Sequence, residues 1–331
     1  MPPARKTDAP EIRAFLEELR RAPWLGRRRS AWPNYVYRFS DVRDVASILR
    51  SGRLLSRQRC RELGIPIIDA ANRQIIEQSP WTHSHARLYF RPHTPTQYWM
   101  EGIRPVTERR GGAHCPVPVF LLFRADDLLT RIDVSFTDGN FARLGSCRHG
   151  STAGFLESLN FRDIYHDDVL PNDFFRKNEI IFARNAEVLV AGELDLGDLD
   201  QVVCRTGGEM ETLLYLLGDQ APTWKDRIRL ERLGETLFYR DFAFITQVQL
   251  IGPAIHGTAR AVVGTYHLSV KVWNEGAAPI VDREHTIEGF PARFAIKLPA
   301  LLERARVQIM VEGDSLAYDA VVSKQQIFSP T

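Results

Sequence analysis

The pattern of apolar and polar positions changes character along the chain. Up to about residue 220, helical and strand patterns are interleaved: Ile12, Leu16 and Leu19 recur at helical spacing, whereas residues 35–39 alternate as in a strand. Beyond about residue 235, period-two alternation dominates, and turn residues separate the apolar runs at the spacing of a β-sandwich. The pattern predicts an α+β fold followed by a small all-β sandwich.

The same pattern suggests where the domains begin and end. We expect a basic helical extension over residues 1–33, an α+β domain over 34–220, a linker helix over 221–234 and a β-sandwich over 235–331. The irregular order of helices and strands favours an α+β fold over a doubly wound sheet. Neither G-x-G-x-x-G nor G-x-x-x-x-G-K-[ST] occurs, so the sequence gives no support to a Rossmann or P-loop nucleotide site.

Composition narrows the class of protein. The chain has 331 residues, of which 44% are hydrophobic, enough for substantial cores. No apolar run has the length of a membrane span, and the first residues lack the apolar stretch of a secretory signal, so we expect a cytoplasmic protein. The four cysteines show no C-x-x-C spacing, and the pair His83 and His85 has no acidic or thiol partner at ligand spacing. We therefore expect no metal site.

Positive charge is concentrated at the start of the chain. The net charge is only +2, yet residues 1–64 hold fifteen Lys and Arg against seven Asp and Glu. Trp24 and Trp32 flank the arginines at 27–29 and offer flat faces on which bases could stack. Such a segment suits a polyanion such as nucleic acid. A solvated basic face is the alternative explanation.

One carboxylate stands out as a candidate for catalysis. Residues 174–183 read FFRKNEIIFA, and Glu179 heads their apolar end. This pattern is typical of the first residue of a buried strand, which would place the Glu179 carboxylate at the lip of a core. The alternative is an edge-strand glutamate paired with Arg176 or Lys177. A single glutamate does not fit paired-carboxylate glycosidase chemistry, but it fits one acid assisting the departure of a group from a sugar.

Two further segments have features of a nucleotide site. Arg38 and Ser40 fall where a strand over residues 35–39 gives way to a helix that ends at Gly52. Backbone amides at such a junction can bind phosphate or ribose. The Asp-Gly-Asn sequence at 138–140 predicts a turn after another strand.

Four segments, taken in order, resemble the DarT family of ADP-ribosyltransferases, which attach ADP-ribose from NAD to a nucleic-acid base. They are YRFS at 37–40 with the helix over 44–54, the strand and loop YFRPHTPT at 89–96, the turn FTDGN at 136–140, and RKNE at 176–179. The resemblance covers about residues 34–219. This chain departs from the family where Arg38 replaces the usual histidine, and where HTPT at 93–96 replaces Arg-Ser-Pro-Met.

The resemblance implies roles for individual residues. As catalytic residues it implies Glu179 and Arg73. For binding NAD, the substrate, it implies Arg38, Ser40, Tyr89, Tyr98 and Asn140. For binding nucleic acid it implies Arg143, Arg148, His149, Arg176 and Lys177. No metal is implied.

The resemblance also implies a biological setting. The acceptor would be a base in single-stranded DNA, with RNA as an alternative partner, and the protein would act as a toxin or phage-defence effector. A macrodomain antitoxin that removes ADP-ribose would be its partner. Transfer to RNA or protein, NAD hydrolysis without an acceptor, and a non-catalytic nucleic-acid-binding protein remain alternatives. The sequence leaves open the target base, the oligomeric state and the role of the sandwich.

Overall fold

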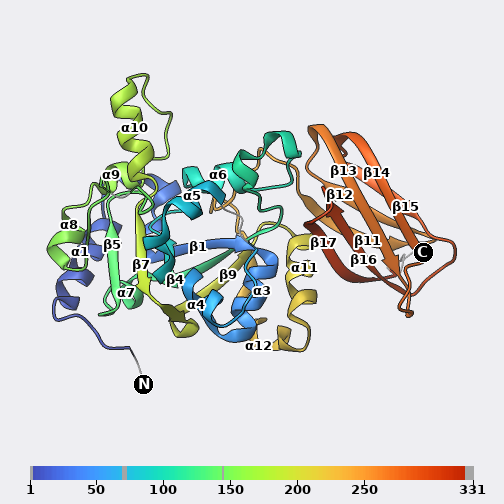
Figure 1. The fold of residues 1–331 in the computed structure, drawn as a ribbon, viewed down its shortest axis with the longest axis horizontal. Helices are drawn as coiled ribbons and strands as arrows, with labels where there is room; N and C mark the ends of the chain where they lie inside the picture. The colour runs from blue at the N-terminus through green and yellow to red at the C-terminus, as the bar shows by residue number, and fades with distance from the viewer. Residues whose placement is uncertain (1–2, 69–72, 144, 325–331) are drawn as a thin grey trace, which may run out of the picture.

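Two parts lie side by side in the computed structural model, which describes residues 3–68, 73–143 and 145–324. The larger part is a mixed helix-and-sheet domain, and the smaller part, orange and red in Figure 1, is made of strands. The side chains of Arg28 and Arg73 are outside the description. The prediction of an α+β fold followed by an all-β unit is confirmed.

An eight-stranded sheet forms the frame of the larger part. Its strands run in the order β10-β9-β4-β1-β3-β7-β5-β6, and all neighbours are antiparallel except β10 and β9. In chain order they are β1 (Tyr35–Asp41), β3 (His85–Tyr89), β4 (Pro118–Arg124), β5 (Val134–Thr137), β6 (His149–Gly150), β7 (Glu187–Ala191), β9 (Leu199–Cys204) and β10 (Ile228–Leu230). A separate two-stranded ribbon pairs β2 (Arg53–Leu55) with β8 (Glu193–Asp195).

Short helices surround this sheet. They are α1 (Ala9–Arg20), α2 (Gly26–Arg29), α3 (Val42–Ser51), α4 (Arg57–Glu62), α5 (Arg73–Gln78), α6 (Pro95–Met100), α7 (Ala125–Leu128), α8 (Ala153–Glu157), α9 (Phe161–Ile164), α10 (Phe174–Ala183), α11 (Gly207–Leu217) and α12 (Ala221–Trp224). Local sequence explains the bounds of α3: the Asp41 side chain accepts from the Arg43 amide at its start, and Gly52 adopts a left-handed conformation after its end. Helix α10 projects away from the sheet (Figure 1).

The sheet has apolar side chains on both faces. On one face, β1, β3, β4 and β7 contribute residues such as Val36, Leu88 and Val188 to a core that also takes in α1, α3 and α11. The other face is aromatic, with Tyr37 and Tyr89 in a second cluster that includes Phe238. Alternation along each strand thus gives the sheet two buried faces. Among the described residues, no helix is long and apolar enough to cross a membrane.

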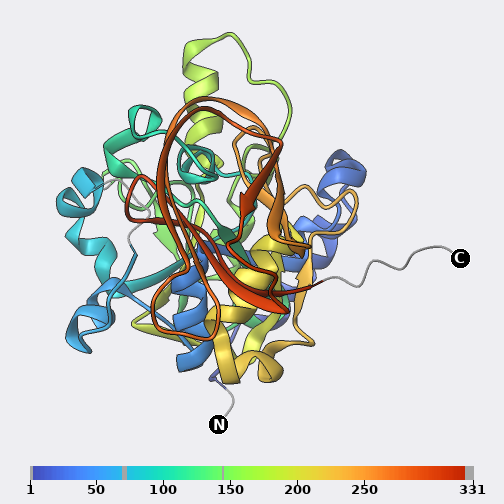
Figure 2. The same cartoon turned by 90° about the vertical axis from the view of Figure 1, so that its right-hand side faces the viewer.

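Two facing sheets form the smaller part, and Figure 2 shows them in front of the larger part. One sheet has the order β11-β12-β15 and the other β14-β13-β16-β17. The strands are β11 (Ile245–Ile251), β12 (Ala254–Ala259), β13 (Val262–Trp273), β14 (Val281–Phe290), β15 (Arg293–Lys297), β16 (Arg304–Val311) and β17 (Ser315–Ser323). Apolar residues from both sheets meet in one core, as the period-two alternation predicts.

Helix α11 lies between the two parts (Figure 1). The Thr206 hydroxyl before it donates to the Ile245 carbonyl, 2.7 Å away, and the Thr212 hydroxyl accepts from the Asp319 amide at 3.2 Å. The Tyr318 hydroxyl donates to Glu211 at 2.8 Å. These bonds fix the sandwich to the helix that completes the larger core.

Several expected elements differ from those observed. The segment over residues 221–234 is not one linker helix, because α12 ends at Trp224 and the chain then adds β10 to the main sheet, beside β9. The helix in the expected N-terminal extension packs against the larger part, since Ile12 and Leu16 lie in the main core.

Candidate active site

Three adjacent strands bring Arg38, Tyr89 and Glu187 together. Tyr89 ends β3 and lies opposite Tyr37 on β1 and opposite Glu187 on β7. In the described part of the chain this is the only residue pair that joins β1 to β3, so the two strands separate beyond it. Arg38 spans the opening: its guanidinium donates to the Arg87 carbonyl at 3.1 Å and to the Ser40 hydroxyl at 3.0 Å. The opening is therefore lined by polar groups.

Glu187 is the buried carboxylate of this region. It has no exposed surface, and the Arg87 guanidinium donates to both of its oxygens, at 2.5 and 2.6 Å. The Phe141 amide donates to the same carboxylate at 3.2 Å. Burial acts to lower the pKa of Arg87, but the charge and hydrogen bonds of Glu187 together raise it above its ordinary value. The two hydrogen bonds fix the orientation of the pair.

The turn at 138–140 holds Glu187 in place from the neighbouring strand. The Thr137 hydroxyl accepts from the Glu187 amide at 2.8 Å and donates to the Gly139 carbonyl at 2.7 Å. Asn140 accepts from Arg87 at 3.4 Å and from the Ala142 amide at 2.9 Å. The predicted turn is thus a supporting wall of the site, and Asn140 contacts the arginine that binds Glu187.

Tyr89 contributes an aromatic face with a polar end. It is 8% exposed, and its ring stacks on Phe39 with centroids 6.3 Å apart. Its hydroxyl is hydrogen-bonded to Thr96, whose own hydroxyl donates to Asn185 at 3.0 Å. Burial, and then the negative charge of Glu187, raise the pKa of Tyr89 above its ordinary value. The Tyr89 hydroxyl therefore stays protonated and able to donate.

Cations gather beside these residues. Burial and, to a smaller extent, the positive charges of Arg38, Arg61 and Arg87 lower the pKa of Arg57, on α4, to about 10. Mutual repulsion among arginines is relieved by an anion, so this cluster can bind a pyrophosphate. Burial raises the pKa of the neighbouring Asp44 to about 6, although it accepts from the Ile68 amide at 2.9 Å.

Glu179 is not among these residues. It lies on helix α10 rather than at the start of a strand, so the expected strand over 179–183 is wrong. Its side chain is 66% exposed and pairs with Arg176 at 3.2 Å, one turn away on the same helix. Asp173 caps the helix by accepting from the Arg176 amide at 2.7 Å. The alternative expectation is right about the pairing with Arg176 but wrong about an edge strand, because the pair lies along one helix.

The other residues expected in the site do not all lie near Glu187. Arg73 is the first residue of α5, and its side chain lies outside the described part of the structure. Tyr98, on α6, contacts the rings of Tyr239 and Phe242 rather than those of Phe39 or Tyr89. Ser40, by contrast, is buried beside Arg38 as expected.

The residues expected to bind nucleic acid fall into two groups. Arg143, Arg148 and His149 are exposed on the segment that follows Asn140, although Arg148 pairs with Asp138 at 2.7 Å. Arg176 and Lys177 lie on α10. Arg176 is held by Asp163 through two hydrogen bonds, whereas Lys177 is exposed. The first group follows the turn that contacts Glu187. Arg176 and Lys177 lie on α10, which projects away from the sheet (Figure 1).

Several side chains of the basic N-terminal segment make contacts inside the protein. Trp32 is 2% exposed and cannot stack on a base, and Trp24 packs near Tyr165. Arg20 pairs with Asp126, and Lys6 is buried and donates to the Leu129 carbonyl at 3.1 Å. Trp32 therefore offers no face for stacking, whereas Trp24 is half-buried.

Sequence reasoning missed Glu187 and Arg87. Glu187 opens the alternating strand β7, which is the position that the sequence interpretation gave to Glu179. The residues around Arg87 do not indicate a role in the site, because its partner Glu187 lies far away in sequence. Among the described residues, no group of three or more His, Cys, Asp or Glu side chains could hold a metal ion.

Comparison with known proteins gives the chain a family. Residues 37–236 match the family model described as "ssDNA thymidine ADP-ribosyltransferase, DarT". No curated protein matches the chain. Among solved structures, Thermus sp. 2.9 DarT in complex with ADP-ribosylated ssDNA is similar at 20% identity and a TM-score of 0.48, covering 62% of this chain and 97% of its own.

Two further structures are similar to this chain. Thermus sp. 2.9 DarT in complex with NAD+ has 21% identity and a TM-score of 0.47, with coverage of 62% and 98%. Thermosipho africanus DarTG in complex with ADP-ribose has 15% identity and a TM-score of 0.46, covering 65% of this chain and 53% of that one. The family match extends over more than half of the chain, from β1 to beyond β10. The chain therefore belongs to the DarT family of ssDNA ADP-ribosyltransferases.

Proposed function

We propose that this protein transfers ADP-ribose from NAD to thymidine in single-stranded DNA, and that Glu187 is the carboxylate at the centre of the reaction. One observation carries this proposal: a fully buried carboxylate, fixed by Arg87, lies next to the Tyr89 ring at the opening between β1 and β3. A carboxylate held there has the fixed charge that stabilises an oxocarbenium-like transition state. The family description supplies the acceptor.

In this proposal, NAD occupies the opening that Arg38 spans. The pyrophosphate interacts with the cluster of Arg38, Arg57 and Arg87, while the nicotinamide ribose lies between Tyr89 and Glu187. Each carboxylate oxygen accepts in more than one direction, so Glu187 can accept from a ribose hydroxyl while bound to Arg87. The assignment replaces Glu179, whose exposed position on α10 gives it no place beside Tyr89.

The chemical step breaks one bond and forms another. The bond between the ribose C1′ and the nicotinamide nitrogen breaks, and its electron pair leaves with neutral nicotinamide. The positive charge that develops on the ribose is stabilised by Glu187. A thymine ring nitrogen then forms the new bond to C1′, and its proton passes to Glu187 and from there to solvent.

The test is an acceptor series. Wild-type protein and Glu187→Gln are incubated with NAD and four substrates of equal length: single-stranded DNA with thymidine, the same DNA without thymidine, RNA, and a protein mixture. We expect thymidine-dependent ADP-ribosylation of single-stranded DNA by wild type alone, detected by mass spectrometry. Transfer to RNA or protein in preference to DNA, or nicotinamide release without transfer, would overturn the proposed acceptor.

We also propose that the activity makes the protein a toxin or a phage-defence effector in the cytoplasm, where single-stranded DNA arises during replication. Bulky adducts on template thymidines would block copying. Expression of wild type should arrest growth, and expression of Glu187→Gln should not. A macrodomain hydrolase that removes ADP-ribose should relieve the arrest. Equal toxicity of the two proteins would argue against this role.

A further inference from the structure

An apolar pocket of about 170 Å3 lies between the two sheets of the sandwich, on the side where β14 and β15 are the terminal strands. On the opposite side the sheets are joined, because Leu250 on β11 forms a parallel bridge with Lys324, which follows β17. Among the described residues, no ladder joins β14 to β15. Figure 1 shows these two strands on the side of the sandwich away from the larger part. The pocket is therefore on a side that the catalytic domain does not cover.

The floor and the walls of this sandwich pocket are apolar. Val270 on β13 and Ile309 on β16 are buried beneath it, and β15 adds Phe294 and Ile296 from the facing sheet. The Phe294 ring lies across Gly257 of β12, where a Cβ atom would be 2.0 Å from the ring, so only glycine allows this position. A dry cavity of about 150 Å3 holds a benzene molecule, so the sandwich pocket has room for one large apolar side chain.

Two basic side chains lie at the mouth of the sandwich pocket. Side chains of β14 alternate between its two faces, and Arg283 and His285 are on the same face as Val281, which is buried in the sandwich core. Arg283 lies opposite Val270 and His285 opposite Leu268, and all four residues line the pocket. Both basic residues are nevertheless exposed. They are therefore on the inner face of an open sandwich, within reach of a ligand.

No carboxylate of the sandwich pocket balances these two residues. None of the described residues that line it is Asp or Glu. The acidic neighbours Asp282 and Glu284 are on the outer face of β14, where Asp282 pairs with Lys271 at 3.3 Å. In the described part of the chain, the side chains of Arg283 and His285 make no hydrogen bond or ion pair. An apolar pocket with such a mouth is complementary to an apolar group flanked by carboxylates.

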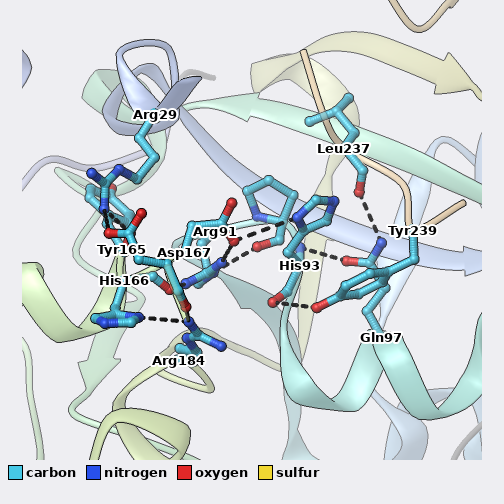
Figure 3. A network of polar contacts seen from close by, with 12 residues as sticks. Arg29, Arg91, His93, Gln97, Tyr165, His166, Asp167, Arg184, Leu237 and Tyr239 are labelled. Atoms are coloured by element: carbon cyan, nitrogen blue, oxygen red, sulfur yellow. Dashed lines mark hydrogen bonds and ion pairs between the residues drawn. The ribbon is translucent and has the colours of Figure 1, made fainter. Parts of the chain in front are cut away.

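The cavity beside the segment over 231–241 differs in this respect. Its volume is about 870 Å3, and carboxylates line it as well as arginines. Figure 3 shows part of its network, in which Arg91 pairs with Asp167 at 2.6 Å and Arg184 contacts His166 at 2.7 Å. Positive and negative groups face one another there, so that cavity favours neither sign of ligand charge. The sandwich pocket does favour one sign.

Strand β14 also has a free edge. It is the last strand of its sheet, and residues 282–286 in its middle are exposed. Its backbone amides and carbonyls that point away from β13 can therefore bond to a further strand. An extended peptide added at this edge turns every second side chain toward the pocket.

We infer that the sandwich binds an extended, acidic peptide of a partner protein. The peptide adds a strand to β14, inserts one large apolar side chain between the sheets, and places carboxylates beside Arg283 and His285. The free edge favours a peptide over a fatty acid or DNA, because neither of these has backbone amides to pair with β14. This inference does not depend on the proposed function. It gives the sandwich the role of recruiting a partner to the enzyme.

Binding of defined peptides to the full chain tests the inference. The probe is a fluorescein-labelled octapeptide of threonines in which one phenylalanine has an aspartate two positions away on each side, so that all three share a face. One companion peptide replaces the phenylalanine by alanine, and another replaces both aspartates by lysines. Fluorescence polarisation gives Kd for wild type, Arg283→Glu, His285→Glu and Arg13→Glu. Arg13 is exposed on α1 and serves as the charge-matched control.

Wild type and Arg13→Glu should bind the probe at least about tenfold more tightly than either companion peptide, which is the usual effect of one charge-assisted hydrogen bond or one buried apolar side chain. Arg283→Glu should bind the probe about tenfold more weakly and should prefer the lysine peptide, because the charge at the mouth is reversed. His285→Glu tests the same mouth independently, and Tm shows that each variant is folded.

Several results would overturn the inference. If wild type binds none of the peptides or binds all three equally, or if both folded variants bind the probe as tightly as Arg13→Glu does, the two basic residues only discourage pairing between edge strands. Fluorescent oleate and fluorescent single-stranded DNA are measured in the same way. If either of these depends on Arg283 while the probe does not, the pocket is a lipid site or a nucleic-acid site instead.

Discussion

Glu187 and Arg87 depend on each other at the scale of single residues. A buried carboxylate is costly unless its charge is balanced, and Arg87 balances this one through two hydrogen bonds. We expect Arg87→Gln to lower the free energy of unfolding by about 3 kcal/mol, because Glu187 would be left unpaired. Arg124→Gln is the control: Arg124 pairs with Asp200 at the surface, and its loss should cost less than about 1 kcal/mol. Urea denaturation of both variants measures the difference, and equal losses would contradict the account.

Asp44 should make stability depend on pH. Burial raises its pKa from 3.8 to about 6, so between about pH 4 and pH 6 the folded protein binds this proton more tightly than the unfolded chain. Stability from this group therefore falls as pH rises through that window. We expect the Tm of Asp44→Asn to fall less than that of wild type between pH 4 and pH 6, measured by differential scanning fluorimetry. Parallel curves for the two proteins would show that Asp44 titrates normally.

The sequence indicated some of these residues and missed others for physical reasons. Arg38, Ser40 and Tyr89 belong to continuous motifs, so their neighbours in sequence identify them. Glu179 was chosen because a short apolar run after a polar residue fits both a strand and a helix. Asp173, whose side chain caps α10, is the local feature that favours the helix. Arg87 could not be identified, because its role comes from a partner on another strand.

At the scale of elements, the contact between the turn at 138–140 and α10 shapes the site. A Cβ atom on Gly139 would lie 2.2 Å from the ring of Phe182, so only glycine allows this approach. Gly139→Ala should shift the turn that supports Glu187 and lower transfer activity about tenfold or more, since small displacements of positioning groups slow catalysis strongly. Gly154→Ala on α8, where nothing lies within 4 Å, should leave activity within about twofold. Transfer rates with single-stranded DNA compare the two, and equal rates would show that this contact has no effect.

Elements with regular patterns were predicted well, and irregular ones were not. Strand β1 covers the strand expected over residues 35–39, and β5 ends just before the turn expected at 138–140. Strand β10 lies in a charged segment that reads as a linker, and it is a strand because β9 offers a free edge. That edge exists only in the folded sheet, so no local pattern in the sequence could indicate it.

At the scale of the whole molecule, α11 makes the two parts interdependent. Its Thr212 accepts from the backbone of β17, and its Leu213 and Leu217 belong to the main core. We expect a truncated protein of residues 1–236 to aggregate or to melt well below the full chain, because the face of α11 that contacts β11 and β17 would be exposed. Tyr318→Phe is a smaller change than the truncation. It should lower the free energy of unfolding by about 1 kcal/mol, because it removes one hydrogen bond to Glu211. A truncated protein with the Tm of the full chain would show that the sandwich is an independent module.

The alternation of apolar residues predicted the sandwich but not this interface. Residues of α11 and β17 lie about a hundred positions apart, and their contact depends on how the two parts dock. The sequence suggested an accessory module, and the structure adds that the module also covers part of the catalytic domain. The segment over 231–241, which joins the two, lines a cavity together with His93 and Arg184 of the larger part.

We propose that the buried Glu187, and not the exposed Glu179, carries the chemistry. The most direct measurement is the initial rate of ADP-ribose transfer to a thymidine-containing single-stranded oligonucleotide, by mass spectrometry, for wild type, Glu187→Gln and Glu179→Gln. We expect Glu187→Gln to be about 100- to 1,000-fold slower, as is usual when a group that stabilises transition-state charge is lost. Glu179→Gln should remain within about twofold of wild type, as for other surface substitutions. A Glu187→Gln protein that is folded, binds NAD and keeps the wild-type rate would contradict the account, and so would a Glu179→Gln protein that loses activity to the same extent.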